Sequence, residues 1–180
     1  MSVVALTGRR IDAPGASVKR FPPSNASTVR ARIREALERL AATALVSSAA
    51  CGADLVALDA AGELGLRRRV VLPFAETRFR ETSVVDRGAE FGPPFDRIIV
   101  EVKAHNDVIT LDGSDDDSAA YLAANVVILD EAEALGRAAN SEVVVMLVRE
   151  AWPGYTGFDK QFADDARNRG LRVVEVASSE

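Results

Sequence analysis

Short apolar runs alternate with amphipathic segments along this chain of 180 residues. The runs have the length of β-strands, and we expect strands at residues 3–6, 44–46, 70–72, 108–111, 143–148 and 171–176. The intervening segments carry apolar residues at helical spacing, so we expect helices at 24–41, 52–64, from Pro93 onward, 115–138 and 161–169, with a short helix or loop at 75–85. This alternation predicts a single α/β domain, in which a mostly parallel sheet has helices on both faces.

The composition is typical of an ordinary globular protein, with 48% hydrophobic and 27% charged residues. No apolar run approaches the roughly 20 residues that a membrane-spanning helix needs. The first five residues lack the basic region and cleavage site of a secretion signal. The single cysteine, Cys51, cannot form an intramolecular disulfide and suits a reducing compartment. We therefore expect a cytoplasmic protein without a membrane partner.

The net charge of −5 argues against general nucleic-acid binding, because such proteins need a basic face for the phosphates. A local basic pocket is compatible with this net charge, and Arg9, Arg10, Lys19 and Arg20 cluster in one loop. Arg9 and Arg10 directly follow a strand and a glycine, which favours a functional role for them. The arginines at 67–69 precede a strand, and we interpret them as solvated charge.

The first strand ends in the turn Thr7-Gly8-Arg9-Arg10. Ligands of α/β proteins bind at the carboxyl ends of the strands. Glycine allows a close approach of the backbone, and arginine supplies planar donors that match a phosphate group. We therefore predict that these four residues bind an anionic, nucleotide-like ligand.

A second turn, from Ser47 to Asp54, joins the next strand to a helix through small residues. Ser47, Ser48 and Gly52 would bring a ligand to the helix N-terminus, where unpaired N–H groups favour an anion. The alternative is that the small residues only permit tight packing of the helix on the strand. Asp54 caps this helix or bonds a sugar hydroxyl, and the cap is the commoner use.

A third turn runs from Trp152 to Asp159, after the strand at 143–148, and leads into another helix. It supplies Gly154, Thr156, Gly157 and, one turn into the helix, Gln161 as candidate ligand-binding residues. If the three strands are neighbours in the sheet, the three turns converge. That convergence would form a pocket.

Other residue types give weaker indications of chemistry. His105 lies near the end of a predicted helix, where a capping or solvated role is favoured. The helix start at Cys51 would lower the pKa of its thiol, but no base neighbours it, so a packing role is favoured. One histidine and one cysteine cannot form a zinc site, and the acidic run at 115–117 fits a helix start better than a metal site. The chain lacks both a Walker loop and a Gly-x-Gly-x-x-Gly fingerprint, which argues against ATP hydrolysis and NAD-dependent redox chemistry. We expect neither a metal nor a cofactor.

At these turns the chain resembles the SLOG superfamily, which joins the Rossmann-like domain of DNA-processing protein A with Lonely-Guy phosphoribohydrolases and related nucleotide sensors. The turn at 7–10 is similar to the Gly-Ser-Arg turn of the DNA-processing group, and 47–54 is similar to its Ser-Gly-Leu-Ala-Arg-Gly-Ile-Asp. The run at 69–74 fits the strand that follows, which adds Pro73 to the candidate ligand-binding residues. The resemblance covers the first half of the chain and implies a single Rossmann-like domain over 1–180.

Two departures from the family bear on activity. Cys51 stands where the DNA-processing group has arginine, which weakens an interpretation as a single-stranded-DNA binder. The phosphoribohydrolases carry a Pro-Gly-Gly-x-Gly-Thr-x-x-Glu loop, and the residues at 153–161 align with it so that Gln161 replaces the essential glutamate. Glutamine cannot act as a carboxylate base, although Asp159 or Glu131 could supply a carboxylate from nearby.

Three functions follow from these observations. The first is a sensor or regulatory module that binds a nucleotide or a nucleotide-derived molecule. The second is an N-glycosidase that acts on a nucleoside monophosphate, and the third is single-stranded-DNA binding. The resemblance also implies a homodimer, for which the apolar stripe Phe95, Ile98, Ile99 and Val102 is a candidate surface, although core burial explains the stripe equally well.

Overall fold

The sheet of this protein has six parallel strands in the order β4-β3-β2-β1-β5-β6 within the residues that the structure describes. That structure is a computed structural model, which describes residues 1–114, 118–150 and 157–179. The strands are β1 (Ser2–Gly8), β2 (Ala42–Ser47), β3 (Arg67–Leu72), β4 (Val108–Thr110), β5 (Glu142–Arg149) and β6 (Arg172–Ala177). The predicted α/β class with a parallel sheet is confirmed. The expected acidic helix start at 115–117, Gly154 and Thr156 lie outside the described residues.

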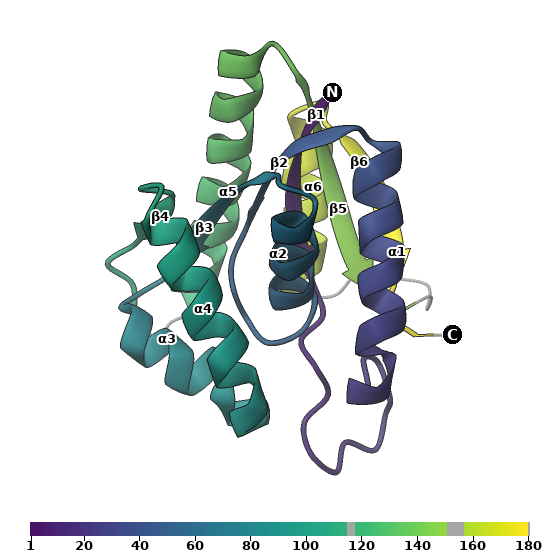
Figure 1. The fold of residues 1–180 in the computed structure, drawn as a ribbon, viewed down its shortest axis with the longest axis vertical. Coiled ribbons are helices and arrows are strands. Elements are labelled where there is room, and N and C mark those ends of the chain that lie inside the picture. Colours follow the sequence, from purple (N-terminus) through teal and green to yellow (C-terminus); the bar gives the residue numbers. More distant parts are fainter. Residues whose placement is uncertain (115–117, 151–156, 180) are drawn as a thin grey trace.

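Helices cover both faces of the sheet (Figure 1). They are α1 (Ala26–Arg39), α2 (Ala53–Glu63), α3 (Glu76–Ser83), α4 (Gly92–Lys103), α5 (Ser118–Ala139) and α6 (Gly157–Asn168), with 3-10 turns at Pro23–Asn25, Val85–Arg87 and Ala89–Phe91. Buried side chains of α1 to α4 share one hydrophobic cluster with one face of the sheet. Most buried side chains of α5 and all those of α6 share a second cluster with the opposite face.

The sequence of β1 shows why both faces must be covered. Val4 and Leu6 point into the cluster beneath α1 and α2, whereas Val3 and Ala5 point into the cluster beneath α5 and α6. All four are almost fully buried. Because side chains alternate along a strand, a strand that is apolar at every position needs a helix layer on each side.

Successive strands are added to one side of β1 first and then to its other side, so the direction in which the sheet grows reverses at β1. The chain leaves β1 toward β2, β3 and β4, and then returns through α5 to place β5 on the other side of β1. In open α/β sheets such a switch point opens a crevice at the carboxyl ends of the strands. Since β2 and β5 both pair with β1, the three predicted turns follow neighbouring strands.

The third turn differs from its prediction in one respect. We expected a loop through Phe158 and a helix from Gln161, but α6 already begins at Gly157. Asp159 and Gln161 therefore both lie in the first part of a helix, where their backbone positions are fixed by α6.

The apolar stripe of α4 belongs to the core. Phe95, Ile98, Ile99 and Val102 are nearly inaccessible to solvent and pack in the cluster with α2 and α3. The stripe is therefore not a free dimer surface, and the alternative of core burial is correct.

The arginines at 67–69 are ion-paired rather than simply solvated. Arg67 and Arg69 both bond the buried carboxylate of Asp107, at distances of 2.7 to 2.9 Å. Arg68 bonds Glu101 at 2.8 Å, and Arg69 also bonds Glu131 at 2.5 Å. These pairs tie β3 to α4, to α5 and to the residue before β4.

In the described part of the chain, no helix combines the length and the apolar character needed to cross a membrane.

Candidate functional site

The carboxyl ends of β1 and β5 pack tightly at Gly8. A Cβ atom at this position would lie 2.6 Å from the carbonyl oxygen of Val148 and 2.7 Å from the Cβ of Ala53. Arg9 N–H then donates to the same Val148 oxygen at 2.8 Å. Glycine at this position therefore lets β1, β5 and α2 meet, and this contact is the structural reason for a glycine there.

The start of α2 is closed by the segment that follows β1. Gly52 has a φ of +128°, and a Cβ on it would lie 2.5 Å from the Arg9 carbonyl oxygen. That oxygen accepts a hydrogen bond from Ala53 N–H at 2.9 Å, and Ile11 N–H donates to the Cys51 oxygen at 3.1 Å. The chain itself therefore uses the Ala53 N–H, and the start of α2 packs tightly against the segment that follows β1.

Arg9 is held by a carboxylate that the sequence analysis did not single out. Its Nε donates to Oε2 of Glu150 at 2.7 Å, and its Nη2 donates to Oε1 at 2.6 Å. The nearby guanidinium of Arg20 lies 3.8 Å from the same Oε1. The hydrogen bonds from Arg9 hold the pKa of Glu150 below its usual value. Glu150 therefore stays ionised and contacts two cations.

Arg10 extends toward the segment after α3. Its Nη2 forms an ion pair with Asp86 and lies 3.4 Å from the Sγ of Cys51. Burial raises the pKa of the Cys51 thiol, although the charge of Arg10 opposes that shift. The lowered pKa that a helix start would give is thus not found, and Cys51 is a buried packing residue.

A pocket of about 360 Å³, here called the carboxyl-edge pocket, lies beside these groups. It is lined by Gly8, Arg9, Arg10, Ile11, Asp12, Ala13, Ala16, Arg20, Arg87, Phe158 and Asp159. The lining comes from the end of β1, the long segment before α1, the turn after α3 and the start of α6. Residues that are far apart in the sequence thus form the pocket at the switch point, and four of them are arginines.

Two carboxyl groups have raised pKa values: that of Asp54, which is buried, and that of Asp159, which is half-buried and lines the carboxyl-edge pocket. Burial raises the pKa of Asp54 to about 7, even though Ala50 N–H donates to its Oδ2 at 3.2 Å and favours the charged form. Burial also raises the pKa of Asp159, and the charge of Glu150 adds to that shift while Arg9 opposes it. The charge of Asp159 raises the pKa of Asp54 further. The protein therefore stabilises the protonated forms of both groups.

Three buried polar atoms have no hydrogen-bond partner in the described part of the chain: Nε of Arg10, Oδ1 of Asp54 and Oε1 of Gln161. Buried polar groups without partners are rare in native proteins, and each one calls for an explanation such as a water or a ligand. All three residues are ligand-binding candidates from the sequence. The structure thus brings Arg9, Arg10 and Gly8 to one pocket, and one of these residues, Arg10, has a buried Nε without a partner among the described residues.

Four of the other candidates lie outside the carboxyl-edge pocket. Thr7 is half-buried beside Leu147 of β5, and Ser47 donates to the Ser48 carbonyl oxygen at 2.8 Å. The Pro73 oxygen accepts from Gly113 N–H at 3.0 Å, and Gly157 adopts a φ of +61° at the start of α6. None of these four lines the carboxyl-edge pocket.

Sequence reasoning missed several residues of the pocket. Asp12, Arg87 and Glu150 lie in or beside it, and Asp86 pairs with its Arg10, whereas Arg20 was already grouped with Arg9 and Arg10 in one basic loop. Glu150 directly follows β5, so its place at the carboxyl edge could have been found from the sequence. Nothing in the sequence pattern indicates that Asp86 would meet Arg10, because that contact joins positions 76 residues apart.

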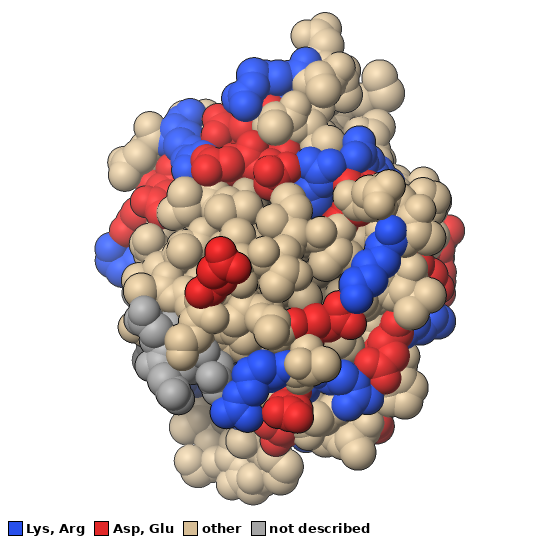
Figure 2. Space-filling model, turned by 90° about the vertical axis from the view of Figure 1, so that its left-hand side faces the viewer, with Lys and Arg blue, Asp and Glu red and all other residues tan. Residues whose placement is uncertain are grey.

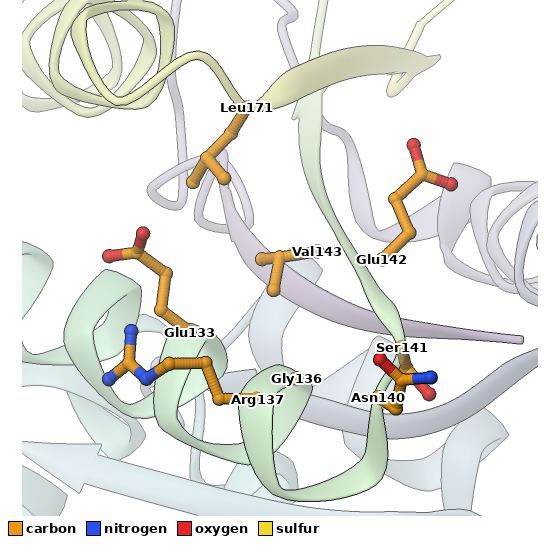
Figure 3. Close-up of a pocket in the computed structure, with 8 residues that line it drawn as sticks. All are labelled: Glu133, Gly136, Arg137, Asn140, Ser141, Glu142, Val143 and Leu171. Atoms are coloured by element: carbon orange, nitrogen blue, oxygen red, sulfur yellow. The ribbon is translucent and has the colours of Figure 1, made fainter.

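Other pockets lie at the opposite ends of the strands. Figure 3 shows one of about 420 Å³ where α5 ends and β5 begins, lined in part by Glu133, Arg137 and Glu142. His105 lines another, beside Arg67. The strands of an α/β sheet carry ligands at their carboxyl ends, so these pockets are weaker candidates.

The face of the molecule on which β4 lies carries both acidic and basic side chains. Figure 2, which views the left-hand side of Figure 1, shows acidic and basic side chains interleaved over that face. A face of this kind lacks the uniform positive charge that phosphate backbones need. Glu131, which we considered as an alternative carboxylate, is paired with Arg69 and does not line the carboxyl-edge pocket.

Comparisons with known proteins give limited guidance. No protein-family model matches the chain, and no curated protein matches it. A solved structure, the X-ray structure of DNA processing protein A (DprA) from Streptococcus pneumoniae, is similar to it with a TM-score of 0.34 and 16% sequence identity. The match covers 96% of this chain and 58% of that chain, so this chain spans little more than half the length of that protein.

Proposed function

We propose that the carboxyl-edge pocket binds the phosphate group of a nucleotide or nucleotide-derived molecule, and that the protein acts as a sensor or regulatory module. The observation that carries this proposal is the convergence of Arg9, Arg10, Arg20 and Arg87 on one pocket at the switch point between β1 and β5. Guanidinium groups bind phosphate through paired hydrogen bonds, and each charged bond is stronger than a neutral one.

Two further features support a ligand that also has hydroxyl groups. The carboxyl group of Asp159 lines the same pocket, and carboxyl groups bond sugar hydroxyls. The Nε of Arg10 is buried without a partner among the described residues, so it has a hydrogen bond to give. The resemblance to the SLOG superfamily points to the same ligand class, to a single SLOG-like domain and to a homodimer.

Arg9→Ala should weaken ligand binding by about 1–3 kcal/mol, the range for a charged hydrogen bond. The measurement is a thermal-shift titration with nucleoside mono-, di- and triphosphates, cyclic dinucleotides, NAD and ADP-ribose, because a ligand that binds the native state raises its Tm. Arg172→Ala is the matched control, since Arg172 forms a similar two-bond pair with Glu142 at the far end of the sheet. Equal ligand shifts in the wild type and in Arg9→Ala would remove Arg9 from the site.

A second candidate function is N-glycosidase activity on a nucleoside monophosphate. The observation that favours it is Asp159, which lines the pocket and has a raised pKa, so that it could protonate a departing base. The test is to incubate the protein with nucleoside monophosphates and to assay released base by chromatography. Base release that Asp159→Asn abolishes would support the N-glycosidase function. Intact nucleoside monophosphate after prolonged incubation would exclude it and would favour the sensor function.

A further inference from the structure

Glu150 contacts two arginines of the carboxyl-edge pocket but does not itself line that pocket. Its Oε1 lies 2.6 Å from Nη2 of Arg9 and 3.8 Å from Nε of Arg20. Both guanidinium groups therefore meet at one carboxylate oxygen, and both arginines line the pocket whereas Glu150 does not. The bonds from Arg9 to Glu150 use its Nε and Nη2, and the N–H groups of its Nη1 take no part in them.

The backbone of Arg20 is fixed from two sides. The carboxylate of Asp12 accepts hydrogen bonds from Arg20 N–H at 3.0 Å and from Phe21 N–H at 3.1 Å. From the other side, the hydroxyl of Ser178 donates to the Arg20 carbonyl oxygen at 2.8 Å, and Ser178 N–H donates to the Arg149 oxygen at 2.8 Å. Ser178 is fully buried. The long segment after β1 is thus tied to the ends of β5 and β6, next to Glu150.

We infer that Arg9 and Arg20 form a two-guanidinium clamp for one phosphate group, and that Glu150 is the positioning residue that holds them in place. This inference rests on the proposed function. A phosphate has enough oxygens to accept bonds from two guanidinium groups at once. Holding both side chains in advance lowers the entropy cost of binding, because long side chains otherwise lose rotamer freedom when a ligand arrives.

In this clamp, the role of Glu150 is opposite to that of a carboxylate that competes with the ligand for the arginines. A carboxylate that occupied the ligand's own place would have to leave, and its removal would tighten binding. A carboxylate that orients the arginines from behind stays in place, so its removal weakens binding. The sign of the effect of Glu150→Gln therefore separates the two roles.

The experiment measures the affinity of the full chain for inorganic pyrophosphate by calorimetry. Glu150→Gln should weaken binding about tenfold, the scale of one charged hydrogen bond. In an Arg9→Ala background, Glu150→Gln should have a much smaller further effect, because a positioning residue acts through the groups that it holds. Glu142→Gln is the matched control, since Glu142 begins β5, the strand that Glu150 follows, and pairs with Arg172 through two hydrogen bonds.

Arg20→Ala keeps the test decisive if Glu150→Gln does not fold, because the Arg20 side chain is 46% exposed and can be removed without opening the core. This variant should weaken pyrophosphate binding several-fold at an unchanged unfolding midpoint. Tighter or unchanged binding by Glu150→Gln, or full additivity with Arg9→Ala, would overturn the positioning role while leaving the proposed function intact. If the folded wild type binds no pyrophosphate and no nucleotide, both the clamp and the proposed function are wrong.

Discussion

Gly52→Ala should lower the free energy of unfolding by about 3 kcal/mol or more. The added Cβ would lie 2.5 Å from the Arg9 oxygen and 2.6 Å from the Arg10 Cα, and both contacts are to backbone atoms that cannot simply rotate away. The φ of +128° adds a conformational cost for any residue with a side chain. Because Arg9 and Arg10 would have to move, the variant should also lose ligand affinity. Urea unfolding measures the first effect.

Gly65→Ala is the control for Gly52→Ala. Gly65 follows the other end of α2 and has a φ of +69°, but no atom lies within 4 Å of its expected Cβ position. Its replacement should therefore cost only the backbone strain, about 1 kcal/mol. If the two variants lose the same stability, the close approach of Arg9 and Arg10 to Gly52 is not what makes glycine necessary there.

Asp54→Asn should remove a strong dependence of stability on pH. The folded state raises the pKa of Asp54 from 3.8 to about 7, so between these values it binds a proton that the unfolded chain releases. The contribution of Asp54 to stability is therefore fully present below about pH 4 and is lost as the pH rises to about 7. Between pH 5 and pH 8 this loss is about 2–3 kcal/mol in the wild type. Unfolding curves at both pH values should show a smaller difference for Asp54→Asn.

Asp107→Asn is a control with the opposite electrostatics. Burial acts to raise the pKa of Asp107, but hydrogen bonds from Arg67 and Arg69 outweigh it and lower the pKa. The stability that this group contributes is present above its unfolded pKa and is lost only in acid, so it is constant between pH 5 and pH 8. Asp107→Asn should lower stability at both pH values without changing the slope. An unchanged slope in Asp54→Asn as well would show that Asp54 ionises freely in the folded protein.

The sequence predicted those features that depend on local pattern. Residues 3–6 have the continuous apolar character of a buried parallel strand, and Val3 and Val4 do face opposite helix layers. The adjacency of the three turns follows from the strand order, which the alternation of strands and helices only partly restricts. The exact start of α6 was missed because Gly157 resembles a loop residue in the sequence.

The site was predicted less completely, for a physical reason. Gly8 and Gly52 were predicted as ligand-binding residues, and the structure shows a further reason for glycine at both positions, which is their close contact with Val148 and with Arg9 of the chain itself. Arg9 and Glu150 are 141 residues apart in the sequence. A local sequence pattern does not predict a contact that only the tertiary fold creates. Arg9 and Arg10 could be predicted because they follow a strand. Their position in the sequence alone places them at the carboxyl edge of the sheet.

The most direct test of the proposed pocket is amide chemical-shift mapping by NMR, with adenosine 5′-monophosphate and inorganic pyrophosphate as probes. If the phosphate binds between β1 and β5, the amide signals of Gly8, Arg10 and Phe158 should shift, and the saturation curves should give one common affinity. The signals of Gly136 and Ser141, at the opposite end of the sheet, should stay unchanged. Shifts confined to Gly136 and Ser141, or no shifts with either probe, would contradict a phosphate site at the carboxyl edge.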